Sequence, residues 1–196
     1  MPNINLERLP VPFKVMVVVP PRVGGWWTSG HRDQAVRGEV HWFSEDVDTD
    51  VIPCILYEGD GPRLSGASSL SLELLAALVL LSLRALSAPL RSAGWAGGIV
   101  GQTDSLGSQY CVAKLYSAAE PGASIIRAMA SRCCKWDIAP ALQWESRDNN
   151  TWADDLSKGA VGGFDPSKRI RVNWADYRDI QVDFEGFSSS ATAEGA

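Results

Sequence analysis

Apolar runs separated by loops rich in Gly, Ser and Asp occupy the first part of the chain. Residues 12–19 (PFKVMVVV) have the composition of a buried strand, and residues 23–30 and 39–43 predict two more strands. Residues 70–86 are almost wholly Leu, Ala and Val, so they predict a helix that is buried nearly all round. Three strands followed by a buried helix are therefore expected here.

The second part of the chain alternates strand and helix patterns. Residues 97–103 (GGIVGQT) predict a buried strand and residues 138–144 predict a last strand, and residues 106–117 and 124–134 predict the helices between them. A last helix is predicted to begin near Thr151, because the turn and cap residues DNN precede TWADDLSKG. Strands and helices in this order suit an α/β fold with one sheet covered by helices on both faces.

Glu73, Asp104 and Asp154 are the candidate site residues, because each carboxylate stands in a distinctive local sequence. Glu73 lies in the apolar helix, where a buried ionised carboxylate is costly unless a cation or hydrogen bonds meet it. Asp104 follows a predicted buried strand, at the end where open α/β sheets bind ligands. Asp154 is near the start of the last predicted helix. Oxygen ligands without a nearby His or Cys favour Mg²⁺ or Mn²⁺ over zinc.

Each of these acids also has a structural explanation. Glu73 would suit an ion pair with Arg63 or Arg84. Asp104 is typical of a turn after a strand, and Asp154 is typical of a cap or dipole partner at a helix N-terminus. Only the combination of the three acids indicates a metal site.

The order of these motifs resembles the ribonuclease H domain of reverse-transcribing mobile elements. The resemblance is carried by a LELLA helix, a strand ending in TD, and the pattern W-x-x-R-x-x-N-x-x-A-D-x-L-S, and it extends from about Val15 to Val172. Segments GGWW, HWFSEDV and GGFDPSKRIRV are also similar to parts of such domains. The residues of the last pattern, which is the most specific, are Trp144, Arg147, Asn150, Ala153, Asp154, Leu156 and Ser157.

The resemblance implies a ribonuclease H-like fold, with a mixed sheet of about five strands, three antiparallel and two parallel, covered by helices on both faces. It implies hydrolysis of the RNA strand of RNA–DNA hybrids by two Mg²⁺ (or Mn²⁺) ions about 4 Å apart. Glu73, Asp104 and Asp154 would be catalytic metal ligands. The implied partners are the RNA–DNA hybrid and a polymerase domain of the same polyprotein.

A further carboxylate ligand, which the resemblance implies, is missing from its expected place. It should be an Asp in the first strand, just upstream of GGW, where this chain has Pro20, Pro21 and Arg22. Either the ligand is lost, or the true first strand lies outside the recorded chain, or another acid replaces it. Without this ligand the domain would serve as a catalytically degenerate structural or interaction module. The acids considered as replacements are Asp33, Asp46, Asp48 and Asp50, of which the last three lie in a segment typical of a solvated turn.

The balance of charge limits how this chain would bind nucleic acid. The net charge is -5 and the isoelectric point is near 5.0, which argues against strong nonspecific binding by the chain alone, because phosphate affinity comes mainly from Lys and Arg. Arg147, Asn150, Lys158 and Lys114 are the candidates for nucleic-acid contacts.

Length and composition predict one domain with two ends that contribute little to it. We expect a loosely attached N-terminus (1–10), a ribonuclease H-like domain (11–164), an extended appendage (165–186) and a disordered tail (187–196). The four cysteines lack CxxC spacing, so zinc is not expected. The Leu-rich helix is shorter than the ~20 apolar residues of a membrane span, and no signal peptide is evident. These features predict an intracellular protein of the nucleus or cytoplasm, without a membrane.

Overall fold

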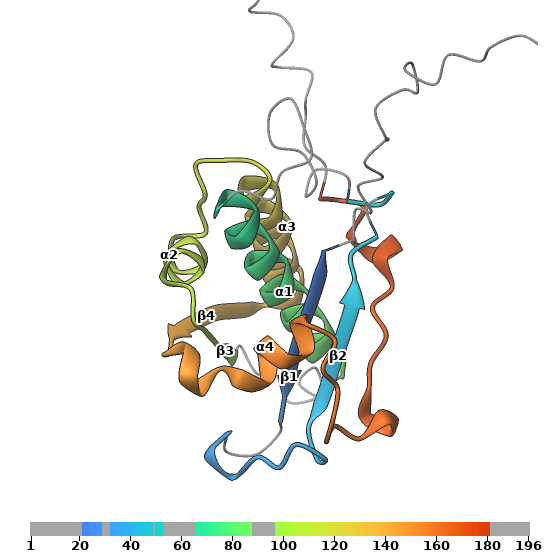
Figure 1. The fold of residues 1–196 in the computed structure, drawn as a ribbon. Helices are drawn as coiled ribbons and strands as arrows, with labels where there is room; N and C mark the ends of the chain where they lie inside the picture. Colours follow the sequence, from blue (N-terminus) through green and yellow to red (C-terminus); the bar gives the residue numbers. More distant parts are fainter. Residues whose placement is uncertain (1–20, 29–31, 49, 53–65, 88–96, 181–196) are drawn as a thin grey trace, which may run out of the picture.

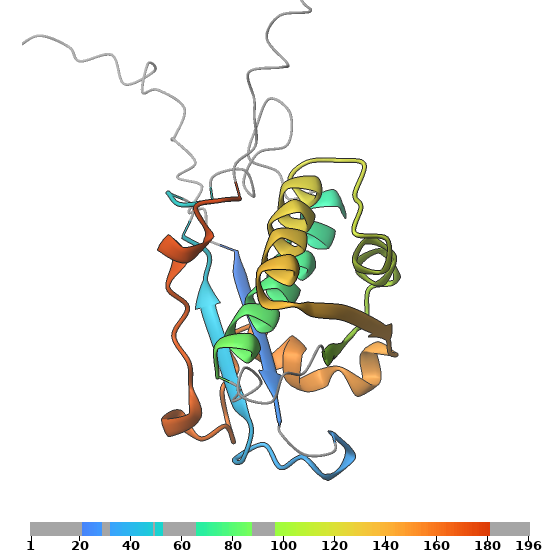
Figure 2. The same ribbon diagram turned by 180° about the vertical axis from the view of Figure 1, so that it is seen from behind.

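The computed structural model describes residues 21–28, 32–48, 50–52, 66–87 and 97–180. Within these ranges the chain has an α/β fold that combines two small sheets with helices (Figure 1). The view from behind in Figure 2 shows two of the helices, α1 and α3, lying side by side. This confirms the predicted fold class at the level of α/β.

Strands β1 (Arg22–Trp27) and β2 (His41–Asp46) form an antiparallel sheet, as the patterns at 23–30 and 39–43 predict. The second strand continues to Asp46, so the acidic segment predicted as a turn begins inside the strand. An acidic residue can lie in this strand because the Asp46 carboxylate accepts a hydrogen bond from its cross-strand neighbour Arg22 at 2.8 Å.

Strands β3 (Gly97–Thr103) and β4 (Ile138–Trp144) form a second, parallel sheet with the predicted bounds. The prediction that residues 97–103 form a buried strand is wrong, since Val100 of β3 is 60% exposed. Their carboxyl ends meet at one edge, because Thr103 pairs with Trp144. The described residues therefore form two sheets of two strands rather than one sheet of about five. The predicted first strand, residues 12–19, lies outside the described residues.

The helices form where the sequence predicts them, but several begin or end at other residues than predicted. Helices α1 (Gly66–Ser87) and α3 (Gly122–Trp136) are longer than predicted, and α4 (Thr151–Ser157) begins where its pattern predicts. Helix α2 (Leu106–Lys114) is shorter than the predicted 106–117, because Leu115 adopts a left-handed conformation with φ of 47° and its backbone N–H caps the helix.

Helices α1 and α4 cover opposite faces of β1, as two neighbouring glycines show. A Cβ built on Gly24 would meet Leu156 of α4, whereas one on Gly25 would meet Leu80 of α1 and Phe43 of β2. Successive residues of a strand point to opposite faces. The antiparallel sheet is therefore enclosed by a helix on each side.

The larger hydrophobic core lies on the α1 side of β1. Leu74, Leu75 and Leu78 of α1 are fully buried there and contribute to it together with β1 and α3. Among the described residues, one stretch, Ser69–Leu86 of α1, is long and apolar enough to cross a membrane by length and composition. This is weak evidence, since the core helix of a soluble protein meets the same criteria.

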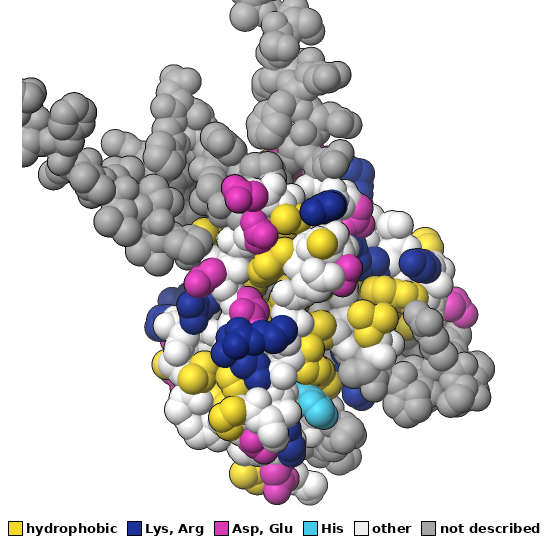
Figure 3. Space-filling view, turned by 90° about the vertical axis from the view of Figure 1, so that its right-hand side faces the viewer, with side chains coloured by type: hydrophobic (Ala, Val, Ile, Leu, Met, Phe, Trp, Pro, Cys, Tyr) yellow, Lys and Arg dark blue, Asp and Glu magenta, His cyan; other side chains and the backbone are white. Residues whose placement is uncertain are grey.

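Residues 165–180 run along the outer edge of β2 (Figure 1). The Ile170 N–H donates to the Trp42 carbonyl at 2.8 Å, and Tyr177 and Ile180 are buried in the larger core. On the face of the molecule that includes this segment, acidic and basic side chains are interspersed (Figure 3). One such group joins Glu45 to Arg169 and Arg171.

Candidate functional site

A cavity of about 890 Å³ lies between the two sheets. Strand β1 lines one side, β3 lines another, and apolar side chains of α1 line the cavity between them. Glu73 of α1, Asp104 after β3 and Asp154 of α4 all line this cavity. The structure therefore brings the three predicted acids to one place, although they are up to 81 positions apart in the chain.

Glu73 is held by hydroxyl groups rather than by a cation among the described residues. Ser108 of α2, which is fully buried, donates to Glu73 Oε2 at 3.1 Å, and Ser69 donates to Oε1 at 3.5 Å. The Ser108 backbone is fixed in turn by Ser105, which caps α2. Hydrogen bonds of this kind lower the cost of placing a carboxylate on an apolar helix.

Asp104 has both carboxylate oxygens occupied by side chains that follow β4. The Arg147 Nε donates to Oδ2 at 3.0 Å, and the Asn150 amide donates to Oδ1 at 3.1 Å. Asn150 is the N-cap residue of α4, yet its side chain makes no capping hydrogen bond. Its amide contacts Asp104 instead, so a cap position is used to orient the candidate site residue.

Asp154 forms an exposed ion pair one turn along its own helix. The Lys158 Nζ lies 2.5 Å from Asp154 Oδ2, and the side chains of Lys158 and Asp154 are 67% and 42% exposed. Pairs with this i, i+4 spacing contribute about 0.5 kcal/mol or less to a helix. The Asp154 carboxylate is therefore only weakly fixed.

Arg147 is the basic residue that faces all three acids. The hydrogen bond and charge of Asp104 raise the pKa of the Arg147 guanidinium, and the charges of Asp154 and Glu73 raise it further. The guanidinium at this position therefore lies in a negative local field. Any cation that enters this part of the cavity meets the same field.

The turn that carries Arg147 is fixed by a second arginine. Residues Arg147–Asn149 form a 3-10 turn after β4, and Arg32 donates from Nη2 to the Asn149 carbonyl at 3.0 Å. Arg32 also forms an ion pair with Glu145. These contacts hold the turn against the loop before β2, which fixes the backbone from which Arg147 and Asn150 reach Asp104.

No group of three His, Cys, Asp or Glu side chains within the described ranges is arranged to hold a metal ion. The predicted ligands thus have suitable oxygen donors, but in this structure these donors face Arg147, Asn150, Lys158 and hydroxyl groups. As they stand, the three acids do not form a metal-binding arrangement.

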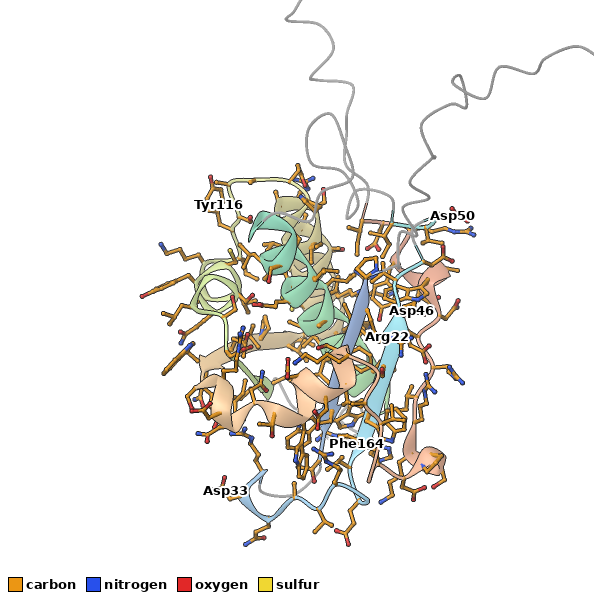
Figure 4. All side chains as sticks on the ribbon, viewed as in Figure 1. Arg22, Asp33, Asp46, Asp50, Tyr116 and Phe164 are labelled. Carbon is orange, nitrogen blue, oxygen red and sulfur yellow. The ribbon has the colours of Figure 1, made fainter. Side chains whose placement is uncertain are left out.

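The acids proposed as replacements for the missing ligand do not line the cavity. In Figure 4, Asp33 and Asp50 lie near opposite ends of the molecule, and Asp46 lies beside Arg22. Arg22 itself lines the cavity, close to the position where the resemblance implies the missing first-strand Asp. Replacement by Asp33, Asp46, Asp48 or Asp50 is therefore not supported by their positions.

No protein-family model, curated protein or solved structure matches this chain. The resemblance to ribonuclease H domains accordingly stays a prediction. What can be said of function rests on the geometry of the cavity.

The nucleic-acid candidates occupy different positions relative to the cavity. Arg147 and Asn150 line it, and Lys158 lies beside Asp154. Lys114 lies at the end of α2 with its Nζ 5.9 Å from the centre of the Tyr110 ring, and it does not line the cavity. A substrate that touches the first three would approach from the α4 side.

Two features of the site were not predicted. A Cβ at Gly24 would lie only 2.5 Å from the Leu156 carbonyl carbon, so this glycine sets how closely α4 approaches β1. The indole Nε1 of Trp27, also on the cavity wall, is buried and has no hydrogen-bond partner among the described residues. Both residues belong to the GGWW segment, but the sequence of this segment does not predict which helix packs against it.

Proposed function

We propose that this chain is a ribonuclease H-like domain of a retroelement, which hydrolyses the RNA strand of RNA–DNA hybrids. The observation that carries the proposal is the convergence of Glu73, Asp104 and Asp154 on one cavity. They come from three separate elements, α1, the end of β3 and α4. Glu73 is the only acid of the apolar helix α1. Its place beside Asp104 and Asp154, which the ribonuclease H resemblance also selects, is not expected of an accidental grouping.

The proposed fold has a fifth strand in addition to the four described ones. Strands β1 and β3 each pair with one neighbour in the described part of the chain, and both line the cavity. The apolar residues 12–19 are our candidate for this strand. Trp27 Nε1, which is buried without a hydrogen-bond partner among the described residues, supports an additional acceptor here, because a buried donor without a partner costs about 1–3 kcal/mol.

The proposed cofactor is Mg²⁺ or Mn²⁺, since the donors are carboxylate oxygens. Glu73, Asp104 and Asp154 would hold it, and the bound ions would activate water and stabilise the leaving oxygen. Because Asp104 and Asp154 now pair with Arg147 and Lys158, the side chains must rearrange before they can bind metal.

The proposed substrate contacts are Arg147, Asn150 and Lys158 around the cavity, with Lys114 farther out. Cationic and amide side chains bind phosphate and sugar groups without reading sequence. The acidic balance of the chain supports delivery of the hybrid by a polymerase domain of the same polyprotein. An intracellular setting, nucleus or cytoplasm, belongs to the same proposal.

The deciding experiment is cleavage of a labelled RNA–DNA hybrid with Mg²⁺ or Mn²⁺. We expect metal-dependent cutting of the RNA strand and a loss of about 100-fold or more in Asp104→Asn. Asp137→Asn is the matched control. It makes the same chemical change at a left-handed helix C-cap, with φ of 54°, where Asn is well tolerated.

A second candidate function is a degenerate domain that serves as a structural or interaction module. Two observations favour it: the described acids form no metal-holding group, and Arg22 lines the cavity near the place of the missing acid. A folded protein that leaves the hybrid intact with both metals would establish this alternative and overturn the nuclease proposal.

A further inference from the structure

Arg147 has the most exposed side chain among the arginine–carboxylate pairs of the described residues, at 81% against 72% for Arg171. Among the described residues its hydrogen bonding is limited to one contact, from Nε to Asp104 Oδ2, and 81% of its side chain is exposed. Its other N–H groups are therefore available to a further acceptor.

Arg132 shows what a structural arginine looks like in the same molecule. Its Nη1 and Nη2 each donate at 2.9 Å to one oxygen of Asp179, and Nη2 also donates to the Asp176 carbonyl. The guanidinium lies over the Tyr177 ring, and only 11% of the side chain is exposed. Bidentate contacts of this kind are strong and specific, whereas a single exposed contact is weak.

The position of Arg147 gives this weak contact a role. Its guanidinium shares one cavity with Glu73, Asp104 and Asp154, and it is bonded to the acid at the end of β3. A divalent cation bound to Asp104 would lie close to the positive charge of Arg147, whose Nε is 3.0 Å from Asp104 Oδ2. Because like charges repel, the cation and the guanidinium would compete for this carboxylate.

We propose that Arg147 is an exchangeable counter-ion of the carboxylate site, which neutralises Asp104 while no divalent cation is bound and turns to a substrate phosphate when one binds. This inference rests on the proposed nuclease function. Exchange is inexpensive because the pair is exposed and monodentate. The released guanidinium lies beside the cavity, on a flexible side chain, and matches the geometry of a phosphate group.

The test is Mn²⁺ binding by the whole chain, measured by the electron paramagnetic resonance signal of free Mn²⁺. We expect Arg147→Gln to lower the Mn²⁺ dissociation constant by about two- to fivefold, which is what removal of an exposed ion pair permits. Arg147→Lys keeps the positive charge, so its dissociation constant should stay near that of the wild type.

Arg22→Gln is the matched control, because Arg22 lines the same cavity but bonds to Asp46 at 2.8 Å instead of to Asp104. A general charge effect would lower the Mn²⁺ dissociation constant in both glutamine variants, because each removes one positive charge from the lining of the same cavity. Competition for Asp104 would lower the Mn²⁺ dissociation constant of Arg147→Gln and leave that of Arg22→Gln unchanged. Equal effects in the two variants would overturn the exchange.

Hybrid binding tests the second half of the exchange. With Ca²⁺ as the divalent cation, Arg147→Gln should bind a labelled hybrid more weakly than wild type, and the slope of log affinity against log salt should fall by about one unit. An unchanged slope would overturn the phosphate contact.

The outcomes separate this inference from the proposed function. If wild type cuts the hybrid and Arg147→Gln binds Mn²⁺ no more tightly, the nuclease stands and the exchange is wrong. If neither protein binds Mn²⁺, both the proposed metal site and the exchange are overturned.

Discussion

Gly24 is where β1 and α4 come closest, and replacing it with alanine should displace the helix that carries Asp154. The added Cβ would lie 2.5 Å from the Leu156 carbonyl carbon and 2.7 Å from the Ser157 nitrogen. Ordinary contact begins at about 3.4 Å, so α4 must move by about 0.9 Å. Both atoms belong to backbone, so no side-chain rotation can relieve the overlap.

The expected cost follows from how α4 is held. Leu156 is fully buried, and its carbonyl accepts a hydrogen bond from the Ser44 hydroxyl at 2.6 Å, so the helix is fixed on the β2 side as well. Overpacking a site of this kind destabilises a protein by about 1–3 kcal/mol. A shift of about 1 Å in Asp154 would lower the rate of a nuclease by about 100-fold.

Urea unfolding and hybrid cleavage measure these two effects separately. With a urea slope of about 2 kcal/mol per molar, the unfolding midpoint of Gly24→Ala should fall by about 0.5–1.5 M. Gly162→Ala is the control, since no atom lies within 4 Å of its built Cβ. An unchanged midpoint in Gly24→Ala would refute the close approach, whatever the activity.

Three further predictions concern stability and thiol chemistry. Ser44→Ala should lower the free energy of unfolding by about 0.5–1.5 kcal/mol through loss of its hydrogen bond to Leu156, as measured by urea unfolding; no change would contradict that contact. Burial, together with Cys134, raises the pKa of the Cys133 thiol from 9.0 to about 11. Its contribution to stability should therefore be complete below pH 9 and decline as the pH rises towards 11, and Cys133→Ala should flatten this decline. In the native protein at pH 8, iodoacetamide should label exposed Cys134 well before Cys133, as read by mass spectrometry.

Patterns of apolar residues predict most of the described elements, because packing against the core leaves a periodic trace in a helix such as α1. The parallel pair β3 and β4 has its predicted bounds, and the buried helix at 70–86 is α1. The end of α2 could not be predicted in this way. It depends on Leu115 adopting a left-handed conformation that is uncommon for leucine.

The candidate site was predictable in part. The sequence marks Glu73, Asp104 and Asp154 because each acid is unusual in its local context, and the structure brings them to one cavity. Their partners carry no such mark. The contacts of Asp104 with Arg147 and Asn150 depend on the pairing of β3 with β4 and on the turn that follows β4, which local sequence does not encode.

The segment that follows α4 has a consequence for solubility. An edge strand with unpaired N–H and C=O groups is a template for pairing with another chain. Residues 169 and 170 cover that edge of β2, because Ile170 N–H occupies the Trp42 carbonyl and Arg169 donates to the Ser44 carbonyl at 2.7 Å. A chain that ended at residue 164 would expose the edge and lose Tyr177 and Ile180 from the core, so it would tend to self-associate through β2.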